Sequence, residues 1–406
     1  MSRIETTDVV IIGAGPSGAI AAALLRQQGR AVLVLERETF PRFSIGESLL
    51  PQSMAYIEEA GLLQDVVEAG FQYKNGATFA RGATETTYFD FREKWTPGWG
   101  TTYQVQRGTF DKVLADGAAR TGAEFRYQQT VLAADVNGEQ PALTVKDNAS
   151  GEQYRVEARF VLDASGFGRV LPRLLDLETP SNFPVRGALF THIEDRTAPG
   201  SFDRNKIIIT THPQHEAVWY WTIPFSNGRC SQGVVAEPAF LAQYQGDELT
   251  RLQTLVHEAP NLKALLADAV WDTPVRQITG YAANVKSLYG KKLCLAGECG
   301  RVSRSGIFIR RDHRHDLIQP GRQSAGPHAG WRNRGLGSRL RRTAQARRGC
   351  LPRLCDRLVR WPLSETDLLQ RQERGNPSHD RQHSGWLRLG RKQPVRARAG
   401  ALAGSP

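Results

Sequence analysis

A glycine-rich turn between two apolar strands constrains this chain more than any other feature. Residues 8–12 (DVVII) are a short β-branched run, and the turn GAGPSG at residues 13–18 follows at once. The pattern predicts an Ala/Leu-rich helix over residues 19–28 and a second buried strand over residues 31–35 (AVLVL). A GxGxxG turn in this order of strand, helix and strand predicts a dinucleotide-binding site.

The chemistry of such a turn follows from its glycines. Gly13, Gly15 and Gly18 allow the backbone to approach a pyrophosphate, which binds at the helix N-terminus, where free N–H groups and the dipole favour anions. Glu36 ends the second strand, and we expect it to accept hydrogen bonds from an adenosine ribose, with Arg37 beside it. The turn alone does not distinguish FAD from NAD.

Two later segments favour a flavin. Residues 160–168 (FVLDASGFG) are a strand that runs through Asp163 into a second glycine-rich turn. Residues 292–298 (KLCLAGE) are a third strand that ends at Gly297 and Glu298. Open α/β sheets bind ligands at the carboxyl ends of their strands, and a late carboxylate there suits the ribityl hydroxyls of a flavin.

The order of these segments, with RGTFDKVL at residues 107–114 between them, resembles the FAD-dependent monooxygenase superfamily. The resemblance implies an α/β fold with a Rossmann-like FAD-binding domain, in which Arg107 and Asp163 contact the cofactor. Arg107 could equally be an ordinary exposed arginine at a helix start. Members of the superfamily normally carry Asp where this chain has Glu298, and the longer side chain weakens the expected flavin contact.

Three further motifs resemble the flavin-dependent halogenases, and their forms are closer to the phenol and pyrrole type than to the tryptophan type. They are FPRFSIGESLLP at residues 40–51, GFQYKNGATF at residues 70–79 and WYWTIP at residues 219–224. The resemblance covers roughly residues 6–300.

The resemblance assigns roles to particular side chains. Lys74 matches the lysine that carries the oxidant, either by a hydrogen bond or as a haloamine. Trp219 and Trp221 match the aromatic partition between substrate and flavin, and alternation places both on one face of a strand. Residues 46–48 (Gly46, Glu47 and Ser48) match the strap that links the flavin and halide sites. The alternative for Lys74 is a solvated loop lysine. The alternative for Trp219 and Trp221 is a pair of core tryptophans in an antiparallel sheet, and a core position does not exclude the partition role.

The implied reaction is FADH2-dependent halogenation of an electron-rich aromatic, a phenol or pyrrole, with O2 and chloride or bromide. The aromatic substrate is free or bound to a carrier protein, and the product belongs to secondary metabolism such as antibiotic biosynthesis. FADH2 is then supplied by a separate NAD(P)H flavin reductase. Two alternatives remain open: an FAD-dependent monooxygenase or reductase of the same superfamily, and an inactive flavin-binding remnant.

Charge is divided unevenly along the chain. Residues 301–406 contain 24 basic and 7 acidic residues, whereas residues 1–300 contain 29 basic and 34 acidic ones. The basic character therefore belongs to the last quarter alone, which argues against a nucleic-acid partner for the whole protein. Glycines interrupt the apolar run 9–25, so no membrane span is expected, and only five cysteines favour a cytoplasmic location.

The expected domain organisation follows these segments. Residues 1–180 form the FAD-binding domain with a substrate-facing insertion near 70–105, and residues 181–284 form an antiparallel β substrate domain. Residues 285–300 return to the first domain, and residues 301–406 form an irregular, largely disordered tail. His and Cys residues in this tail have no spacing typical of a metal module, so no metal is expected.

The tail carries the trace of a different reading frame. Codons that the genetic code permits can be written for residues 301–315. When the first base is dropped and the first base of the Asp316 codon is added at the end, the shifted triplets encode EFLDPVFSSGVTIAM. This contains the halogenase motif DPxFSSGV, which the chain otherwise lacks after Gly297-Glu298. We therefore expect that residues from about 301 onward are translated out of frame, by a genuine frameshift or a sequencing error.

Resequencing the DNA that encodes residues 296–320 tests this prediction. We expect one surplus or missing base near codon 301, after which the frame encodes the DPxFSSGV motif. A clean read that confirms the arginine-rich frame with no such base contradicts the hypothesis.

Overall fold

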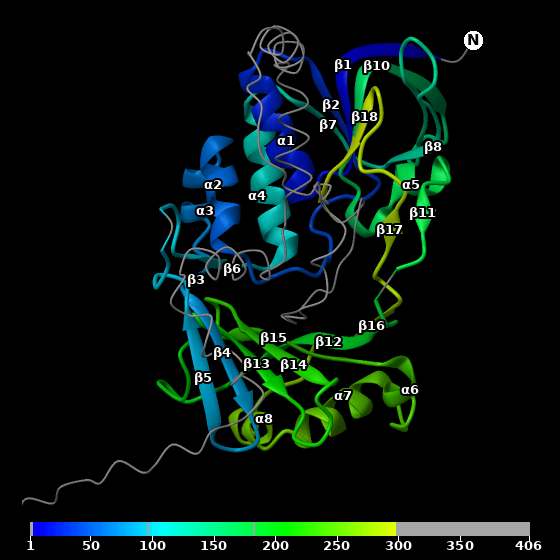
Figure 1. The fold of residues 1–406 in the computed structure, drawn as a ribbon. Helices are drawn as coiled ribbons and strands as arrows, with labels where there is room; N and C mark the ends of the chain where they lie inside the picture. Colours follow the sequence, from blue (N-terminus) through cyan, green and yellow to red (C-terminus); the bar gives the residue numbers. More distant parts are fainter. Residues whose placement is uncertain (1–2, 96, 182, 298–406) are drawn as a thin grey trace, which may run out of the picture.

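The structure is a computed structural model that describes residues 3–95, 97–181 and 183–297. It contains two seven-stranded sheets, one above the other in Figure 1. The upper sheet has the order β7-β2-β1-β10-β9-β8, with β18 also paired to β10. Its strands are β1 (Ile4–Ile12), β2 (Val32–Leu35), β7 (Glu124–Arg126), β8 (Gln129–Asp135), β9 (Ala142–Asp147), β10 (Gln153–Asp163) and β18 (Leu293–Leu295).

The centre of this sheet is parallel and buried. Strand β1 lies between β2 and β10 and is parallel to both, and β18 is parallel to β10. The whole of β2 is buried, as expected for a strand covered on both faces. The carboxyl ends of β1, β2, β10 and β18 therefore meet at one edge. This confirms the predicted α/β fold with a Rossmann-like arrangement.

Helices α1 (Pro16–Gln27) and α4 (Arg107–Arg120) pack against each other beside this sheet (Figure 1). Residues 18–25 of α1 are all buried, which explains why this helix is rich in Ala and Leu rather than amphipathic. The shorter helices α2 (Pro51–Glu59), α3 (Leu63–Glu68) and α5 (Val170–Leu174), with the 3-10 turn η1 (Gly166–Gly168), complete this half.

The lower sheet has the order β16-β12-β15-β14-β13-β4-β5. Its strands are β4 (Gly76–Arg81), β5 (Glu85–Asp90), β12 (Gly187–Glu194), β13 (Lys206–Thr211), β14 (Trp219–Pro224), β15 (Arg229–Ala236) and β16 (Arg276–Thr279). Helices α6 (Pro238–Leu241), α7 (Glu248–His257) and α8 (Pro260–Leu265) lie below it in Figure 1.

The strands of the lower sheet that come from residues 181–284 pair with one another antiparallel, as predicted. Strands β4 and β5, from the segment near residues 70–105, extend this sheet, and β4 pairs with β13 in parallel. That segment is thus part of the lower sheet itself.

Two short ribbons join the two halves. Strands β3 (Gln72–Lys74) and β6 (Thr102–Gln104) pair antiparallel where the chain enters and leaves the β4–β5 hairpin. Strands β11 (Glu178–Thr179) and β17 (Asn284–Val285) pair on the other side. Figure 1 shows β3 and β6 at the level where the two halves meet.

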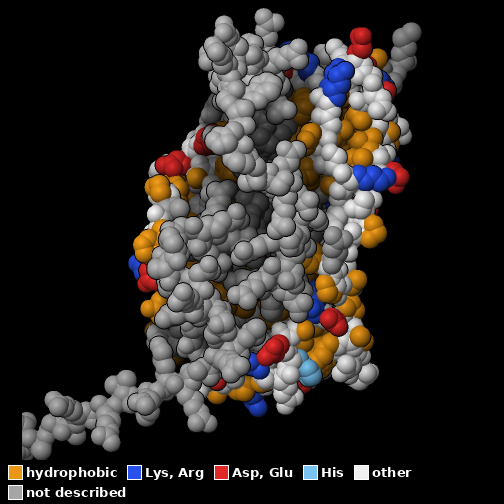
Figure 2. Space-filling view, viewed as in Figure 1, with side chains coloured by type: hydrophobic (Ala, Val, Ile, Leu, Met, Phe, Trp, Pro, Cys, Tyr) orange, Lys and Arg blue, Asp and Glu red, His pale blue; other side chains and the backbone are white. Residues whose placement is uncertain are grey.

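On the face shown in Figure 2, basic and acidic side chains of the described residues are interspersed at the margins of the molecule. Across residues 3–297, apart from the gaps at 96 and 182, no helix has the length and apolar character that a membrane crossing needs. The described residues do not include Glu298 or residues 301–406. The predictions of a shifted reading frame and of disorder in this tail therefore concern residues outside the described ones.

Candidate active site

The glycine-rich turn packs tightly against the turn that follows β10. Gly13 has φ +97°, and a Cβ there would lie 2.7 Å from the carbonyl oxygen of Ala164. A Cβ on Gly18 would lie 2.0 Å from the Gly13 oxygen. Among the described residues, a Cβ on Gly15 would meet two side-chain atoms within 4 Å, Arg42 Nη2 at 3.5 Å and Asp111 Oδ2 at 3.9 Å. As far as these residues go, the N-terminus of α1 is therefore open to a ligand at Gly15.

Glu36 lies across this turn, directly after β2. Its carboxylate accepts hydrogen bonds from the backbone N–H of Ala14 (2.8 Å) and of Glu38 (3.0 Å). Arg37 is exposed and donates to the Glu38 carboxylate at 2.9 Å. The structure thus places Glu36 at the turn, as the sequence predicts, and directs Arg37 toward solvent-exposed Glu38.

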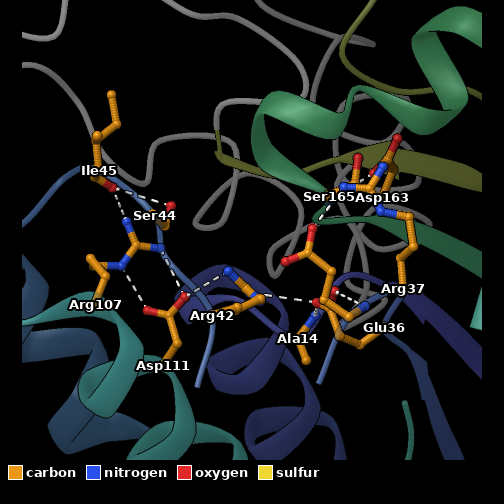
Figure 3. A network of polar contacts seen from close by, with 11 residues as sticks. Ala14, Glu36, Arg37, Arg42, Ser44, Ile45, Arg107, Asp111, Asp163 and Ser165 are labelled. Atoms are coloured by element: carbon orange, nitrogen blue, oxygen red, sulfur yellow. Dashed lines mark hydrogen bonds and ion pairs between the residues drawn. The ribbon is translucent and has the colours of Figure 1, made fainter. Parts of the chain in front are cut away.

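A chain of alternating charges extends from Glu36 to Arg107 (Figure 3). Arg42 lies 3.5 Å from Glu36 and 3.3 Å from Asp111, and Asp111 is fully buried in α4. Arg107 binds both oxygens of Asp111, at 2.7 and 3.0 Å, and also donates to the Ile45 carbonyl. Arg107 is therefore not the exposed helix-start arginine that the alternative expected.

Sequence reasoning missed Arg42 and Asp111. Asp111 stands four residues after Arg107, a spacing that places both side chains on one face of a helix and could have indicated the pair. Arg42 carried no comparable signal, because its partners come from β2 and α4.

These residues fit the pyrophosphate of FAD. The Nε of Arg42 is buried and has no hydrogen-bond partner among the described residues. Buried polar groups are normally paired, so an unpaired guanidinium nitrogen beside the open N-terminus of α1 suits an anionic group at Gly15. The donor set here contains backbone amides and arginine, the groups that bind phosphates.

The two later motifs meet the same turn. Asp163 is fully buried, and its carboxylate accepts hydrogen bonds from the backbone N–H of Ser165 (2.9 Å) and Leu171 (2.6 Å). It holds the DASG turn in shape. A Cβ on Gly297 would lie 2.7 Å from Ser17 Oγ, which places the late glycine against the first turn of α1.

The strap, extended from here on by one residue at each end to residues 45–49, runs between the two halves. Gly46 has φ +92°, and a Cβ there would lie 3.0 Å from Arg107 Nη1. Glu47 is buried, and its Oε1 lies 2.6 Å from Nε2 of His192 on β12. His192 is a third residue that sequence reasoning missed. The strap therefore contacts the upper half through Arg107 and the lower sheet through His192.

Lys74 is fully buried at the end of β3. Its Nζ donates to the Leu49 carbonyl at 2.9 Å and lies 5.0 Å from the centre of the Phe91 ring. The alternative of a solvated loop lysine is wrong, because the side chain is enclosed between the ribbon, the strap and Phe91.

Trp219 and Trp221 lie on one face of β14, with ring centroids 6.1 Å apart. They belong to the apolar cluster that includes Phe43 and Ile45 of the upper half, whereas α7 and α8 cover the other face of the sheet. Trp221 packs on Gly233, where a Cβ would lie 2.3 Å from its ring, and its Nε1 donates to Ser231 Oγ at 3.0 Å. Trp219 is thus a buried core residue, and Trp221 is half-buried against the same cluster, on the side that faces the strap.

An ion pair fixes the loop that brings Phe91 to Lys74. Asp90 accepts hydrogen bonds from the side chain of Arg92, at 2.6 Å to Nη2, and from its backbone N–H at 2.9 Å. The Arg92 guanidinium holds the pKa of Asp90 below its usual value of 3.8. Phe91 lies between these two residues, so the pair sets its position.

Comparison with known proteins identifies a matching family and several relatives. Residues 6–297 match the family described as FAD binding domain. A brominase of 1H-pyrrole-2-carbonyl-[peptidyl-carrier protein] from Pseudoalteromonas luteoviolacea is 31% identical over 239 residues, 58% of this chain and 56% of the brominase. The chain therefore spans little more than half the length of that relative.

Two solved structures share the fold. A flavoprotein/dehydrogenase from Cytophaga hutchinsonii is 40% identical with a TM-score of 0.71, and the match covers 74% of this chain and 73% of that one. The myxobacterial chondrochloren halogenase is 28% identical with a TM-score of 0.66, over 74% and 70% of the two chains.

Gly15→Ala tests the pyrophosphate site. We expect the variant to fold normally, because φ at Gly15 is −70° and a Cβ has only ordinary contacts there. The same Cβ would occupy the space through which a pyrophosphate approaches, so FAD affinity should fall about tenfold or more. Titration of the apoprotein with FAD, followed by flavin fluorescence, measures this. Gly138→Ala, at an ordinary surface position, is the control, and equal FAD affinity in both variants contradicts the assignment.

Acid unfolding tests the Asp90–Arg92 pair. A carboxyl group with a lowered pKa stabilises the fold above its unfolded pKa, and this contribution is lost as the pH falls through the folded value. Wild type should therefore exceed Asp90→Asn in free energy of unfolding at pH 6, and the difference should shrink below about pH 4. Urea titrations from pH 6 to pH 3 measure it, and a difference independent of pH would exclude an ionic contribution.

Proposed function

Because the chain belongs to the FAD binding domain family and has halogenases among its relatives, we propose that it is a flavin-dependent halogenase. Its substrates are an electron-rich aromatic, a phenol or pyrrole, with O2 and chloride or bromide. The observation that carries the proposal is the complete burial of Lys74 beside the strap, with Trp219 and Trp221 on the sheet face that points to the same strap.

The upper half is the part that holds FAD. The glycine turn at residues 13–18 and Arg42 suit the pyrophosphate, and Glu36 suits the ribose. Bound as FADH2, the cofactor supplies the two electrons that reduce O2 and so makes halide oxidation to hypohalous acid possible. Within the described residues a single glycine turn of this kind is present, which supports delivery of reduced flavin by a separate NAD(P)H flavin reductase.

Lys74 receives the oxidant. Its amine nitrogen attacks the halogen of hypohalous acid, so that an N–halogen bond forms, the halogen–oxygen bond breaks, and hydroxide leaves with the amine proton as water. The aromatic carbon of the substrate then takes the halogen, the N–halogen bond breaks, and the ring loses a proton. Burial protects such a haloamine from hydrolysis by bulk water.

Trp219 and Trp221 exclude the organic substrate from the flavin side. Trp219 is buried in the apolar cluster of the lower sheet, and Trp221 packs against it, held by its hydrogen bond to Ser231 and by contact with Gly233. A rigid aromatic wall of this kind passes a small oxidant more readily than a phenol or pyrrole. This favours halogenation over direct hydroxylation of the substrate.

The named substrates of relatives narrow the aromatic class. The brominase of Pseudoalteromonas luteoviolacea is named for a pyrrole carbonyl group on a peptidyl-carrier protein. A carrier-bound pyrrole is accordingly the first substrate to test for this chain, ahead of free phenols. A secondary-metabolite pathway and a cytoplasmic location accord with this substrate class.

One observation favours a second candidate function. The Cytophaga hutchinsonii relative, at 40% identity, is described as a flavoprotein/dehydrogenase. An FAD-dependent reductase or monooxygenase would oxidise NAD(P)H without a partner reductase and would not respond to halide. Both properties are measured with purified protein and NADH, in the presence and absence of bromide.

Lys74→Ala tests the proposed reaction. With a flavin reductase, NADH and bromide, the variant should consume FADH2 and O2 at the wild-type rate and form no brominated product. The reason is that FAD contacts lie in the upper half, whereas Lys74 acts after halide oxidation. Oxygen consumption and mass spectrometry of the product are measured together.

The matched control is Lys112→Ala, an exposed lysine on α4 paired with Asp116, which should leave both quantities unchanged. Product formation by Lys74→Ala at the wild-type yield removes Lys74 from the reaction. No product from any variant, including wild type with its reading frame restored, rejects the halogenase assignment.

A further inference from the structure

Three buried polar atoms beside Lys74 have no hydrogen-bond partner among the residues that the structure describes. Eight side-chain atoms in the described part of the chain are buried in this way, and three of them belong to Ser48, Thr102 and Gln104. They are the hydroxyl oxygens of Ser48 and Thr102 and the carbonyl oxygen of Gln104. Buried polar groups are costly to leave unpaired, so such a concentration in one place points to a missing ligand.

The strand register brings these atoms to Lys74. Strand β6 lies between β3 and the strap: Thr102 pairs with Lys74, and Gln104 bridges to Ser48. Directly opposed residues, and alternate residues along a strand, point to the same face, so all four side chains share one face of this ribbon. Tyr73, on the opposite face, is 40% exposed, whereas Lys74, Thr102 and Gln104 are 2% exposed or less.

The position of the amine follows from its hydrogen bond. Lys74 Nζ donates to the carbonyl of Leu49, and the Leu49 N–H donates to Tyr103 at 3.1 Å. Leu49 therefore lies opposite Tyr103, between Thr102 and Gln104. To reach it, the Lys74 side chain crosses the ribbon face that carries both unpaired groups.

The orientation of Gln104 restricts what can bind there. Its Nε2 donates to the backbone carbonyl of Arg204 at 3.0 Å, which leaves Oε1 as an acceptor that needs a donor. A halide ion has no donor and would be repelled by this oxygen. A small neutral molecule that both donates and accepts hydrogen bonds satisfies Gln104 and the two hydroxyls together.

We propose that Thr102, Gln104 and Ser48 form, with Lys74, a binding site for hypohalous acid. The inference rests on the proposed function and specifies the residues that hold the oxidant before it reacts. The O–H of hypohalous acid donates to Gln104 Oε1, and its oxygen accepts from Thr102 or Ser48. The halogen is then turned toward the Lys74 amine, which displaces hydroxide as described above.

The site works as a positioning device for the oxidant. Hypohalous acid, like water, both donates and accepts hydrogen bonds, so it matches the unpaired polar atoms of Ser48, Thr102 and Gln104. Thr102 and Gln104 fix the oxygen end, which keeps the halogen on the amine side and the oxidant inside the protein. Without them, the oxidant is expected to escape before it reacts with Lys74.

The test uses hypochlorite as the probe and needs no flavin. The protein receives sodium hypochlorite, is separated from free oxidant by gel filtration, and is titrated with iodide to count retained oxidising equivalents. The value for Lys74→Ala, which includes all other reactive groups, is subtracted. We expect Thr102→Val and Gln104→Leu each to retain about tenfold less oxidant at Lys74 than wild type, the effect of about one lost hydrogen bond.

Matched variants separate this role from a structural one. Thr102→Ser keeps the hydroxyl and should restore retention. Thr102→Val should melt at or above the wild-type temperature, because it removes a buried hydroxyl that has no partner among the described residues. Thr222→Val, a buried threonine whose hydroxyl donates to Gln232 on the helix-covered face, should retain oxidant as wild type does.

If Thr102→Val and Gln104→Leu both retain as much oxidant as wild type, the proposal is overturned and the unpaired atoms are assigned to ordered water alone. Equal retention by wild type and Lys74→Ala overturns it as well. Loss of retention in the two variants, with rescue by Thr102→Ser, supports the site even if a flavin reductase assay yields no halide-dependent product. That combination would reject the proposed halogenase function and leave the oxidant site standing.

Discussion

The hydrogen bond from Lys74 Nζ to the Leu49 carbonyl joins the elements on which the site depends. It ties the ribbon that leads into the lower sheet to the strap that leaves the upper half. The strap is held further by Arg107, which donates to Ile45, and by Glu47, which pairs with His192. A buried lysine thus lies where the two halves meet, and its amine holds one end of the strap.

The charged side chains of the upper half form a network in which opposite charges are paired. Glu36, Arg42, Asp111 and Arg107 alternate in sign, so each buried or partly buried charge has an opposite neighbour (Figure 3). Paired charges are tolerated away from water, whereas isolated ones are not. Within the network, Arg42 lies beside the N-terminus of α1, and its Nε has no hydrogen-bond partner among the described residues. The fold therefore provides a preformed anion site and fixes Arg107 to the strap with the same residues.

The relatives of this chain include a flavoprotein/dehydrogenase and a halogenase. The flavoprotein/dehydrogenase and the halogenase share the fold with this chain, so the fold itself does not decide between them. The decision falls on side chains outside the dinucleotide site: the buried lysine, the polar atoms around it and the indoles of β14. The lysine and the polar atoms lie at the junction of the two halves, and the indoles lie on the sheet face that is turned toward the strap.

The sequence by itself determined the α/β fold, the dinucleotide turn at Gly13–Gly18 and the segments that meet it. These follow from local patterns: a buried β-branched strand, close-approach glycines and a carboxylate at a strand end. It also placed Trp219 and Trp221 on one face, because a strand has a period of two. Only the tertiary structure decided that Lys74 is buried, that Arg42 and His192 belong to the site, and that β4 pairs in parallel with β13. Each of these depends on contacts between segments far apart in the chain, for which no local periodicity exists.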